Sequence, residues 1–287
     1  MKHLRLPFLA CVCATIHAAP LPDISSVPPD LHIPELSDDP PAAGKRVRLV
    51  LFEGAPPIIL YLPTDWNPDK KFPVIMEFAG NGNFKNPFGD ISTGLPEGSK
   101  LGYGLSGGEG FIWACVPFLN EAGDHVAITW WGDPPDYRPD STVAFLKRAV
   151  PAICDRFSGD PQRVILSGFS RGAIAANAIG LHDDEIAKLW RGFICYSHYD
   201  GATGRWPFAG ADADSARKRL ARLGGRPQLI CSESPLDGIR KYLENSGVTG
   251  DFTFLDTGFR NHNDAWTLRP SPARDAAREW LADVINF

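Results

Sequence analysis

Short apolar runs alternate with amphipathic stretches over most of the chain. Residues 72–79, 111–118 and 163–167 are apolar runs of strand length. Between the second and third runs, apolar side chains recur with a period of 3.6 over residues 142–157, which predicts a helix that Pro151 should kink or loosen. Strands that alternate with helices predict an α/β fold, with a mostly parallel twisted sheet and helices on both of its faces.

The remaining elements follow the same alternation. An antiparallel strand pair is expected at residues 46–52 and 57–62, and a short extended piece is expected to end at residues 129–133. Beyond the third apolar run, the pattern predicts strands at 191–196, 226–231 and 251–256 and helices at 212–223, 237–246 and 272–284.

Two segments do not fit a minimal α/β domain. Residues 80–110 are rich in glycine and have no periodicity, and residues 199–210 carry Trp206 and Phe208 in a second irregular stretch. Long irregular segments in compact domains are usually functional, and both segments follow the carboxyl end of a predicted strand, where α/β sheets bind their ligands. We therefore expect the two segments to form the walls of a substrate cleft.

Length and charge narrow the range of functions. The chain has 287 residues, of which 44% are hydrophobic, so residues 45–287 can form one catalytic domain with a sizeable core. The formal net charge is −5 and there is no tract rich in Lys and Arg. Nucleic acid and anionic membranes are therefore not expected as partners. The sequence gives no indication of an oligomeric state.

The N-terminal residues have the pattern of an export signal. Lys2 and Arg5 precede an apolar stretch over residues 6–16, and Ala18 and Ala19 supply small residues for cleavage. We expect residues 1–19 to be a signal peptide and the protein to be secreted or periplasmic. Residues 20–44 are rich in proline and lack periodicity, which predicts an extended lead-in on the domain surface.

Removing the signal leaves four cysteines, an even number that an oxidising compartment could pair. Two of them end apolar strands, where buried free thiols are common, so free thiols are favoured over disulfides. No Cys and His spacing resembles a zinc site, and neither a metal nor a cofactor is expected. The four are Cys115, Cys154, Cys195 and Cys231.

The pentapeptide at residues 168–172, Gly-Phe-Ser-Arg-Gly, has the form G-x-S-x-G. It follows a predicted strand and opens an alanine-rich stretch typical of a helix. Such a strand, turn and helix holds a serine at the apex of a sharp turn, above the edge of a parallel sheet. Ser170 is therefore the candidate nucleophile.

A base and an acid follow in a suitable order. His262 comes after the last predicted strand, and the order Ser, acid, His is that of the α/β-hydrolase type. Asp237, six residues beyond Cys231, is the favoured acid, and Glu233 is the alternative because its longer side chain could reach from a position nearer the strand. Asp237 could instead cap the helix that is predicted to begin beside it.

Acyl transfer also needs donors for a developing oxyanion and a wall for the substrate. The backbone amides of Arg171 and Asn81 are the candidate oxyanion donors. The first belongs to the sharp turn at Ser170, called the elbow below, and the second to the glycine-rich loop after residue 79. The side chains that could line the cleft are one histidine and three tryptophans, although an aromatic side chain is often simply part of the core. They are His198, Trp131, Trp206 and Trp266.

From Phe72 to the C-terminus, the chain resembles the α/β-hydrolase superfamily. Residues 140–172, with Phe145-Leu146, the motif Asp-Pro-Gln-Arg-Val at 160–164 and the serine pentapeptide, resemble the secreted polyhydroxybutyrate-depolymerase and feruloyl-esterase branch. That resemblance implies a serine esterase that cleaves acyl esters, often on polysaccharides.

The sequence therefore predicts an exported serine hydrolase that cleaves carboxylic esters through an acyl-enzyme on Ser170. Its substrates would be small-molecule or polysaccharide-linked esters, with carbohydrate or aryl groups. The alternatives are a serine peptidase or polyester depolymerase of the same fold, or a catalytically inactive homologue that binds glycans.

Overall fold

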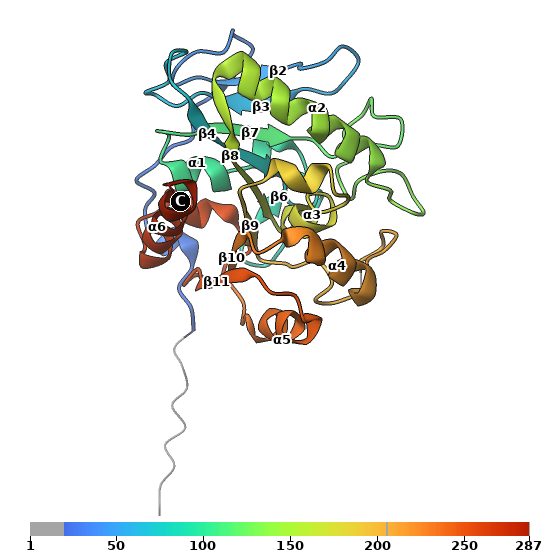
Figure 1. The fold of residues 1–287 in the computed structure, drawn as a ribbon. Coiled ribbons are helices and arrows are strands. Elements are labelled where there is room, and N and C mark those ends of the chain that lie inside the picture. The colour runs from blue at the N-terminus through green and yellow to red at the C-terminus, as the bar shows by residue number, and fades with distance from the viewer. Residues whose placement is uncertain (1–19, 205, 287) are drawn as a thin grey trace, which may run out of the picture.

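The computed structural model describes residues 20–204 and 206–286, so the predicted signal peptide lies outside the described residues. Within them, nine strands form one sheet in the order β1-β2-β3-β7-β4-β8-β9-β10-β11, and a separate hairpin pairs β5 with β6. All neighbours from β7 to β11 are parallel, whereas β3 is antiparallel to both β2 and β7 (Figure 1). The strands are β1 Leu36–Ser37, β2 Arg46–Leu49, β3 Ile58–Tyr61, β4 Phe72–Phe78, β5 Phe84–Lys85, β6 Ile91–Ser92, β7 Ile112–Val116, β8 Gly159–Phe169, β9 Gly192–Tyr196, β10 Pro227–Ser232 and β11 Asp251–Asp256.

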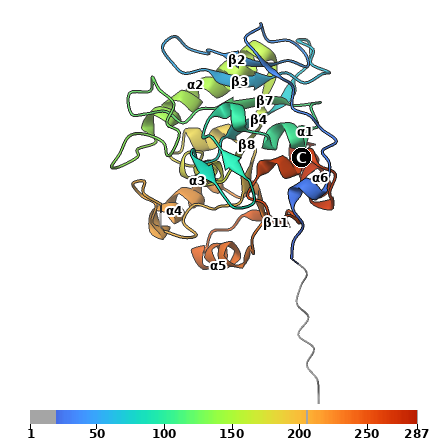
Figure 2. The same ribbon diagram turned by 180° about the vertical axis from the view of Figure 1, so that it is seen from behind.

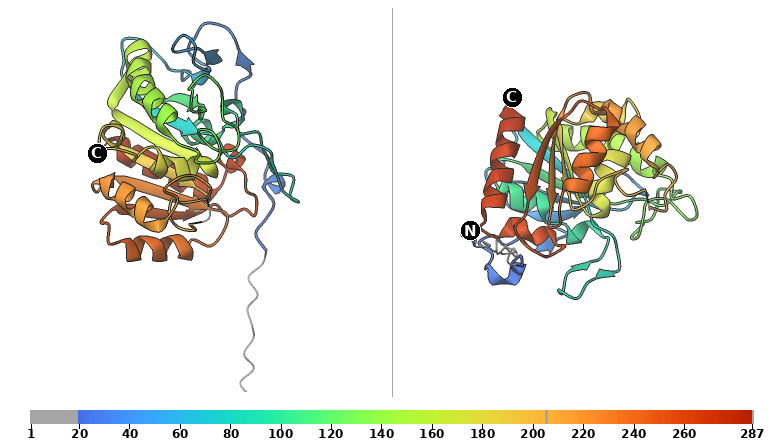
Figure 3. Two further views of the ribbon diagram at one scale, coloured as in Figure 1. Left: turned by 90° about the vertical axis from the view of Figure 1, so that its right-hand side faces the viewer. Right: turned by 90° about the horizontal axis from the view of Figure 1, so that it is seen from below.

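Helices cover both faces of the sheet. Helices α2 to α5 pack on one face and α1 and α6 on the other, as Figure 3 shows from below. The sheet separates two hydrophobic cores, the first beneath α2 to α5 and the second beneath α1 and α6. In β4, Val74, Met76 and Phe78 face the first core and Ile75 faces the second, because successive side chains of a strand point to opposite faces. The predicted α/β architecture is therefore confirmed. The helices are α1 Leu101–Ser106, α2 Asp140–Phe157, α3 Arg171–Ala178, α4 Ala213–Leu220, α5 Asp237–Ser246 and α6 Pro272–Asn286, with short 3-10 turns η1 Ile24–Ser26, η2 Pro96–Gly98, η3 Ile186–Leu189, η4 Ala221–Leu223 and η5 Asp264–Leu268.

The register of the parallel strands brings their carboxyl ends into one row. Phe169 at the end of β8 is opposite Tyr196 at the end of β9, Tyr196 is opposite Cys231 of β10, and Ser232 is opposite Asp256 of β11. The residues that follow these four strands are therefore neighbours in space, although they are far apart in the sequence.

Residues 80–110 are more regular than the sequence indicates. They contain the β5–β6 hairpin, seen in teal in Figure 2, then η2 and α1. Glycines in α1 allow close packing, because a Cβ at Gly104 would lie 2.1 Å from Thr267 Oγ1 and one at Gly102 would lie 2.4 Å from the Trp113 ring. These glycines replace the apolar residues that would otherwise mark an amphipathic helix. The extended piece expected at 129–133 is not a strand but a loop.

The four cysteines among the described residues are buried and free: Cys115, Cys154, Cys195 and Cys231. Burial raises the pKa of each thiol, and raises that of Cys154 to about 11. The thiolate is the reactive form of cysteine, so these side chains are expected to be inert core residues.

Two further features are missing from residues 20–204 and 206–286. No helix there has the length and apolar character needed to cross a membrane. No cluster of three or more His, Cys, Asp or Glu side chains in this part of the chain is arranged to hold a metal ion.

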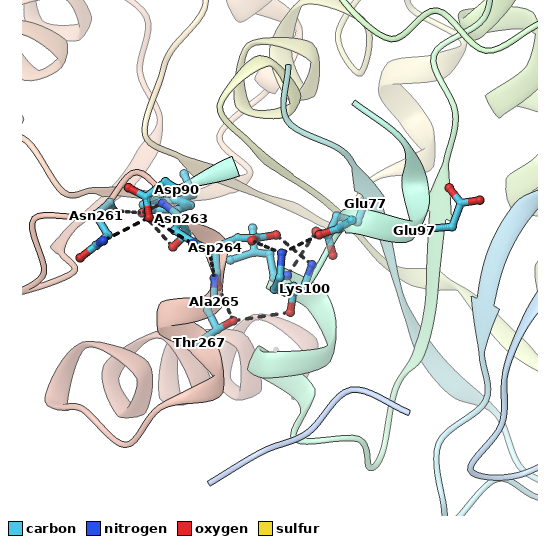
Figure 4. Close-up of polar contacts among 12 residues, drawn as sticks. Glu77, Asp90, Glu97, Lys100, Asn261, Asn263, Asp264, Ala265 and Thr267 are labelled. Carbon is cyan, nitrogen blue, oxygen red and sulfur yellow. Dashed lines mark hydrogen bonds and ion pairs between the residues drawn. The ribbon is translucent and has the colours of Figure 1, made fainter. Parts of the chain in front are cut away.

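Glu77 on β4 is a fully buried carboxyl group near the second core. Its carboxylate, labelled in Figure 4, accepts hydrogen bonds from the backbone N–H groups of Leu101, at 3.2 Å, and Gly102, at 2.7 Å. It also accepts one from Trp113 Nε1 at 2.6 Å. Burial, followed by the nearby charge of Asp264, raises the pKa of Glu77 from 4.5 to about 7.

We expect this carboxyl group to make the protein less stable as the pH rises from about 4.5 to about 7. In that window the unfolded chain has released the Glu77 proton and the folded protein still binds it, so the free energy of unfolding falls, by on the order of 3 kcal/mol. Glu77→Gln has no proton to release and should flatten this slope, whereas Glu53→Gln, at an exposed position, should retain it. Urea denaturation at pH 5 and pH 8 measures the slope, and equal slopes in wild type and Glu77→Gln would contradict the assignment.

Candidate active site

Ser170 lies on a sharp turn between β8 and α3. Its φ of +56° and ψ of −114° are a strained backbone conformation for a residue with a side chain. Both flanking glycines are required by close contacts, because a Cβ at Gly168 would lie 2.2 Å from the Gly172 backbone and one at Gly172 would lie 2.3 Å from Phe78 O. The G-x-S-x-G sequence therefore lets this turn pack directly against the end of β4.

Three polar side chains form a continuous hydrogen-bonded chain at the carboxyl edge of the sheet. Ser170 Oγ lies 2.9 Å from His262 Nε2, and His262 Nδ1 lies 2.7 Å from Glu233 Oε1. Glu233 directly follows β10, and His262 is on the loop after β11. With a proton on Nδ1 donated to Glu233, Nε2 is free to accept the hydroxyl proton of Ser170.

The structure brings Glu233, not the favoured Asp237, to His262. Asp237 is the first residue of α5, and its side chain is exposed. Its charge lies in the first turn of the helix, where it interacts favourably with the helix dipole. The preference for Asp237 is therefore corrected: α5 carries this residue to the surface, and the longer side chain of Glu233 reaches the imidazole from one residue beyond the strand.

Ser197, which the sequence analysis did not identify, is a further member of this cluster. It directly follows β9 and has a φ of +86°. Its hydroxyl lies 2.8 Å from Glu233 Oε1 and 2.9 Å from His262 Nδ1. Burial alone would raise the pKa of Glu233, but the hydrogen bond and charge of His262, with the Ser197 hydroxyl, leave this pKa below its usual value. The sequence signal that could have identified Ser197 is its position directly after β9, the strand that pairs with the elbow strand β8.

The side chain of Arg171 holds the loops around the nucleophile. Its guanidinium group is buried and donates to three backbone carbonyls, those of Ala127 at 3.1 Å, Gly80 at 3.0 Å and Gly94 at 3.2 Å. It also lies over the ring of Phe118, 4.0 Å from the ring centroid. Burial lowers the pKa of Arg171 to about 9, which leaves the group charged at neutral pH. One side chain thus joins three loops to the elbow.

These contacts fix the backbone on both sides of Asn81. The Gly80 carbonyl accepts from Arg171, and the Gly82 N–H donates to Ile128 O at 2.7 Å. A Cβ at Gly82 would lie only 2.4 Å from Ile128 O, so glycine is required there. Asn81 is therefore held in a fixed position in the loop that leaves β4, next to the elbow.

Aromatic side chains surround His262. The ring centroid of His198 lies 5.4 Å from that of His262 and 5.3 Å from that of Trp206, and the ring of Phe84 on the hairpin lies 5.0 Å from His262. Burial, helped by the charge of His262, lowers the pKa of His198, which favours its neutral form. Of the two irregular segments predicted to line a cleft, residues 80–110 thus place Phe84 next to His262, and residues 199–210 place Trp206 next to His198.

Two of the predicted cleft residues lie elsewhere. Trp131 is 0% exposed and packs in the first core against Phe118 and Phe208. Trp266 is 1% exposed and packs against Tyr196 in the second core. The prediction that they line the cleft is therefore wrong, because both rings are enclosed by the layers that cover the sheet.

Comparisons with known proteins detect the fold but no sequence relative. No family model matches the chain, and no curated protein matches it significantly in sequence. Among solved structures, it is similar to an acetyl ester-xyloside bifunctional hydrolase from Caldicellulosiruptor lactoaceticus, with 15% identity, a TM-score of 0.52 and coverage of 85% of this chain and 97% of that one. It is also similar to a thermostable esterase from Pseudomonas putida, with 16% identity, a TM-score of 0.51 and coverage of 80% and 79%.

A third similar structure is a peptidase, dipeptidyl peptidase 4 from Porphyromonas gingivalis, with 15% identity and a TM-score of 0.53. It is matched over 84% of this chain but only 36% of its own. The chain likewise spans 58% of one matching esterase and 33% of another matching peptidase. At such identities the similarity shows the fold alone. The chain has the α/β-hydrolase fold, so the fold that the sequence predicted is confirmed.

Proposed function

We propose that the protein is a serine hydrolase that cleaves carboxylic esters through an acyl-enzyme on Ser170. The observation that carries the proposal is the unbroken chain of hydrogen bonds from Ser170 Oγ through His262 to Glu233. A hydroxyl is a weak nucleophile until a base removes its proton, and a neutral imidazole at 2.9 Å can do so. A binding protein without catalysis has no need of this arrangement, which argues against the inactive homologue.

The reaction proceeds in two halves. Ser170 Oγ attacks the ester carbonyl while His262 Nε2 takes the hydroxyl proton, and His262 then returns that proton to the departing alcohol. Glu233 holds the imidazole in the tautomer that accepts at Nε2 and stabilises the imidazolium that forms. Water attacks the acyl-enzyme with His262 again as base, which releases the acid and restores Ser170.

The oxyanion is proposed to bind to the backbone N–H groups of Arg171 and Asn81. The first belongs to the residue after the nucleophile, the usual position for this donor in the fold. The second lies on a loop that the Arg171 side chain fixes through Gly80 O. Donors that are already in place stabilise the charge that develops in the transition state without further reorganisation.

His198 and Trp206 are proposed to contact the substrate. The His198 ring neighbours those of His262 and Trp206, and the centroid of the Trp206 ring lies 5.6 Å from that of a further aromatic side chain, Trp130. Such a wall suits a flat aryl or carbohydrate group, and one similar structure is described as acting on acetyl esters and xylosides. Small-molecule or polysaccharide-linked esters are therefore the proposed substrates. Residues 1–19 are proposed to be the signal that exports the protein.

A peptidase is the second candidate, because dipeptidyl peptidase 4 is among the structures with this fold. The same three side chains would serve amide hydrolysis. Parallel assays on an acetyl or feruloyl ester and on a dipeptide p-nitroanilide would separate the two, and faster turnover of the anilide would favour the peptidase.

A fluorophosphonate probe tests the proposed nucleophile directly. We expect the folded protein to be labelled with one probe per chain at Ser170, because the activated hydroxyl displaces fluoride from phosphorus. Peptide mass spectrometry locates the adduct. Heat-unfolded protein and Ser170→Ala are the controls and should remain unlabelled. If the folded wild type is not labelled at Ser170, the proposed mechanism is wrong.

A further inference from the structure

The carboxylate of Asp90 binds the loop that carries His262. Asp90 lies at the end of the hairpin turn before β6 and is 2% exposed. Its Oδ2 accepts from the backbone N–H of His262 at 3.0 Å, and its Oδ1 accepts from the side-chain amides of Asn261 at 3.1 Å and Asn263 at 3.2 Å. Figure 4 shows Asp90 together with Asn261 and Asn263. Three consecutive residues around the base thus bind one carboxylate.

Asp90 is itself held by a second residue of the hairpin, Asn86. Asn86 Nδ2 donates to Asp90 Oδ2 at 2.8 Å, and Asn86 Oδ1 accepts from the Asp90 N–H at 3.0 Å. All four side-chain or backbone groups that donate to the carboxylate are neutral N–H groups. A buried carboxylate is tolerated only when its oxygens are well paired, so this arrangement favours one position of the base loop over others.

The base loop has little regular structure of its own to hold it. Between β11 and η5, residues 257–263 form no helix or strand, and Gly258 has a φ of +75°. Without outside contacts, such a loop would sample several positions of the imidazole. Asn261 supplies two more contacts, since its Oδ1 accepts from the Ile24 N–H at 2.7 Å and its carbonyl accepts from Tyr196 Oη at 3.1 Å.

The segment that carries Asp90 is also fixed to the nucleophile. The guanidinium group of Arg171 donates to the carbonyls of Gly80 and Gly94, on either side of the hairpin. Further along, Asp264 accepts from the Lys100 N–H at 2.8 Å and from Lys100 Nζ at 3.1 Å (Figure 4). Residues 80–100 therefore connect the elbow at one side to the base loop at the other.

We propose that Asp90 is a positioning residue that sets the distance between His262 and Ser170, an inference that rests on the proposed function. Asp90 does not touch the reacting atoms. It holds the backbone of the base through the hairpin, and Arg171 holds the same segment to the elbow. A displacement of about 1 Å at a reacting group can cost on the order of a hundredfold in rate. Loss of the Asp90 contacts should therefore reduce turnover more than substrate binding.

Asp90→Asn tests the proposal, because an amide in place of the carboxylate cannot accept from all four donors. We expect the His262 amide to exchange hydrogen about 10-fold faster or more, as followed by mass spectrometry of peptides covering 257–265. We also expect kcat on p-nitrophenyl acetate, per site titrated in the burst phase, to fall about 10- to 100-fold, with KM changed less than about 3-fold. Glu97→Gln is the matched control: it makes the same change in charge on the same segment, where the side chain pairs with Arg48 and lies apart from the Asp90 cluster (Figure 4).

The possible results separate positioning from a general loss of structure. If Asp90→Asn only reduces the number of titratable sites, with kcat per site and amide exchange as in wild type, the proposal is overturned. If that variant does not fold, Asn86→Ala frees Asp90 from the hairpin without changing the charge and should give the same effects at a smaller size, about 3- to 10-fold. Unchanged values there overturn the proposal. If wild type hydrolyses no ester, the proposed function fails, and amide exchange alone still decides whether Asp90 holds the base loop.

Discussion

Ser170→Ala is expected to lower kcat on p-nitrophenyl acetate by about 10⁴-fold or more, with little change in KM. The reason is that alanine removes the atom that forms the proposed acyl-enzyme, whereas the side chains around the site and the proposed oxyanion donors remain. Initial rates at saturating ester, together with circular dichroism to show that the variant is folded, measure the effect. The residual rate then reports what the oxyanion donors contribute without a nucleophile.

Ser234→Ala is a suitable control for this change, because it removes a hydroxyl from an exposed serine next to Glu233. It should have the turnover of wild type. If Ser170→Ala kept the wild-type rate, the measured hydrolysis would come from another group, and the acyl-enzyme would have to be abandoned.

Glu233→Gln should have the next largest effect, a loss of about 10²- to 10⁴-fold in kcat. A glutamine amide facing Nδ1 can donate a hydrogen bond, which favours the tautomer with the proton on Nε2. That tautomer donates to Ser170 instead of accepting its proton, so the base is lost although the geometry is retained. Rates at several ester concentrations would show the loss in kcat.

Asp237→Asn is the matched variant for the acid, since it makes the same chemical change at the other candidate. We expect turnover close to wild type and a loss of stability of about 0.3–1 kcal/mol, because the charge is removed from the first turn of α5. The reverse pattern, with Asp237→Asn inactive and Glu233→Gln active, would show that the acid is Asp237 after all.

The fold could be predicted because its signals are local. Most strands of the parallel sheet contain a contiguous apolar run, and the turn at Ser170 has a glycine two positions away on each side, where the backbone contacts leave no room for a Cβ. The order of strands and helices along the chain then limits the arrangement to few possibilities. For the same reason, Ser170 and His262 could be singled out as a pair.

The acid and the cleft were harder to predict because they depend on where each side chain finally points. Counting residues from the end of β10 cannot show that α5 begins at Asp237 and turns it to the solvent. Trp131 and Trp206 are both aromatic residues after strands, yet one is enclosed in the core and the other lies beside His198. Asp90 contacts residues 171 to 173 positions away, and no local pattern marks such a contact.

The lead-in is attached to the same loop as His262, so residues 22–24 help to hold that loop in place. The Arg260 N–H donates to Pro22 O at 3.1 Å, the Arg260 side chain pairs with Asp23 at 2.8 Å, and Ile24 N–H binds Asn261. Proteolytic trimming that stops before Pro22 preserves all three links. Removal of residues up to and including Ile24 would take away the N–H group that donates to Asn261 Oδ1 and would release one side of the loop that carries His262.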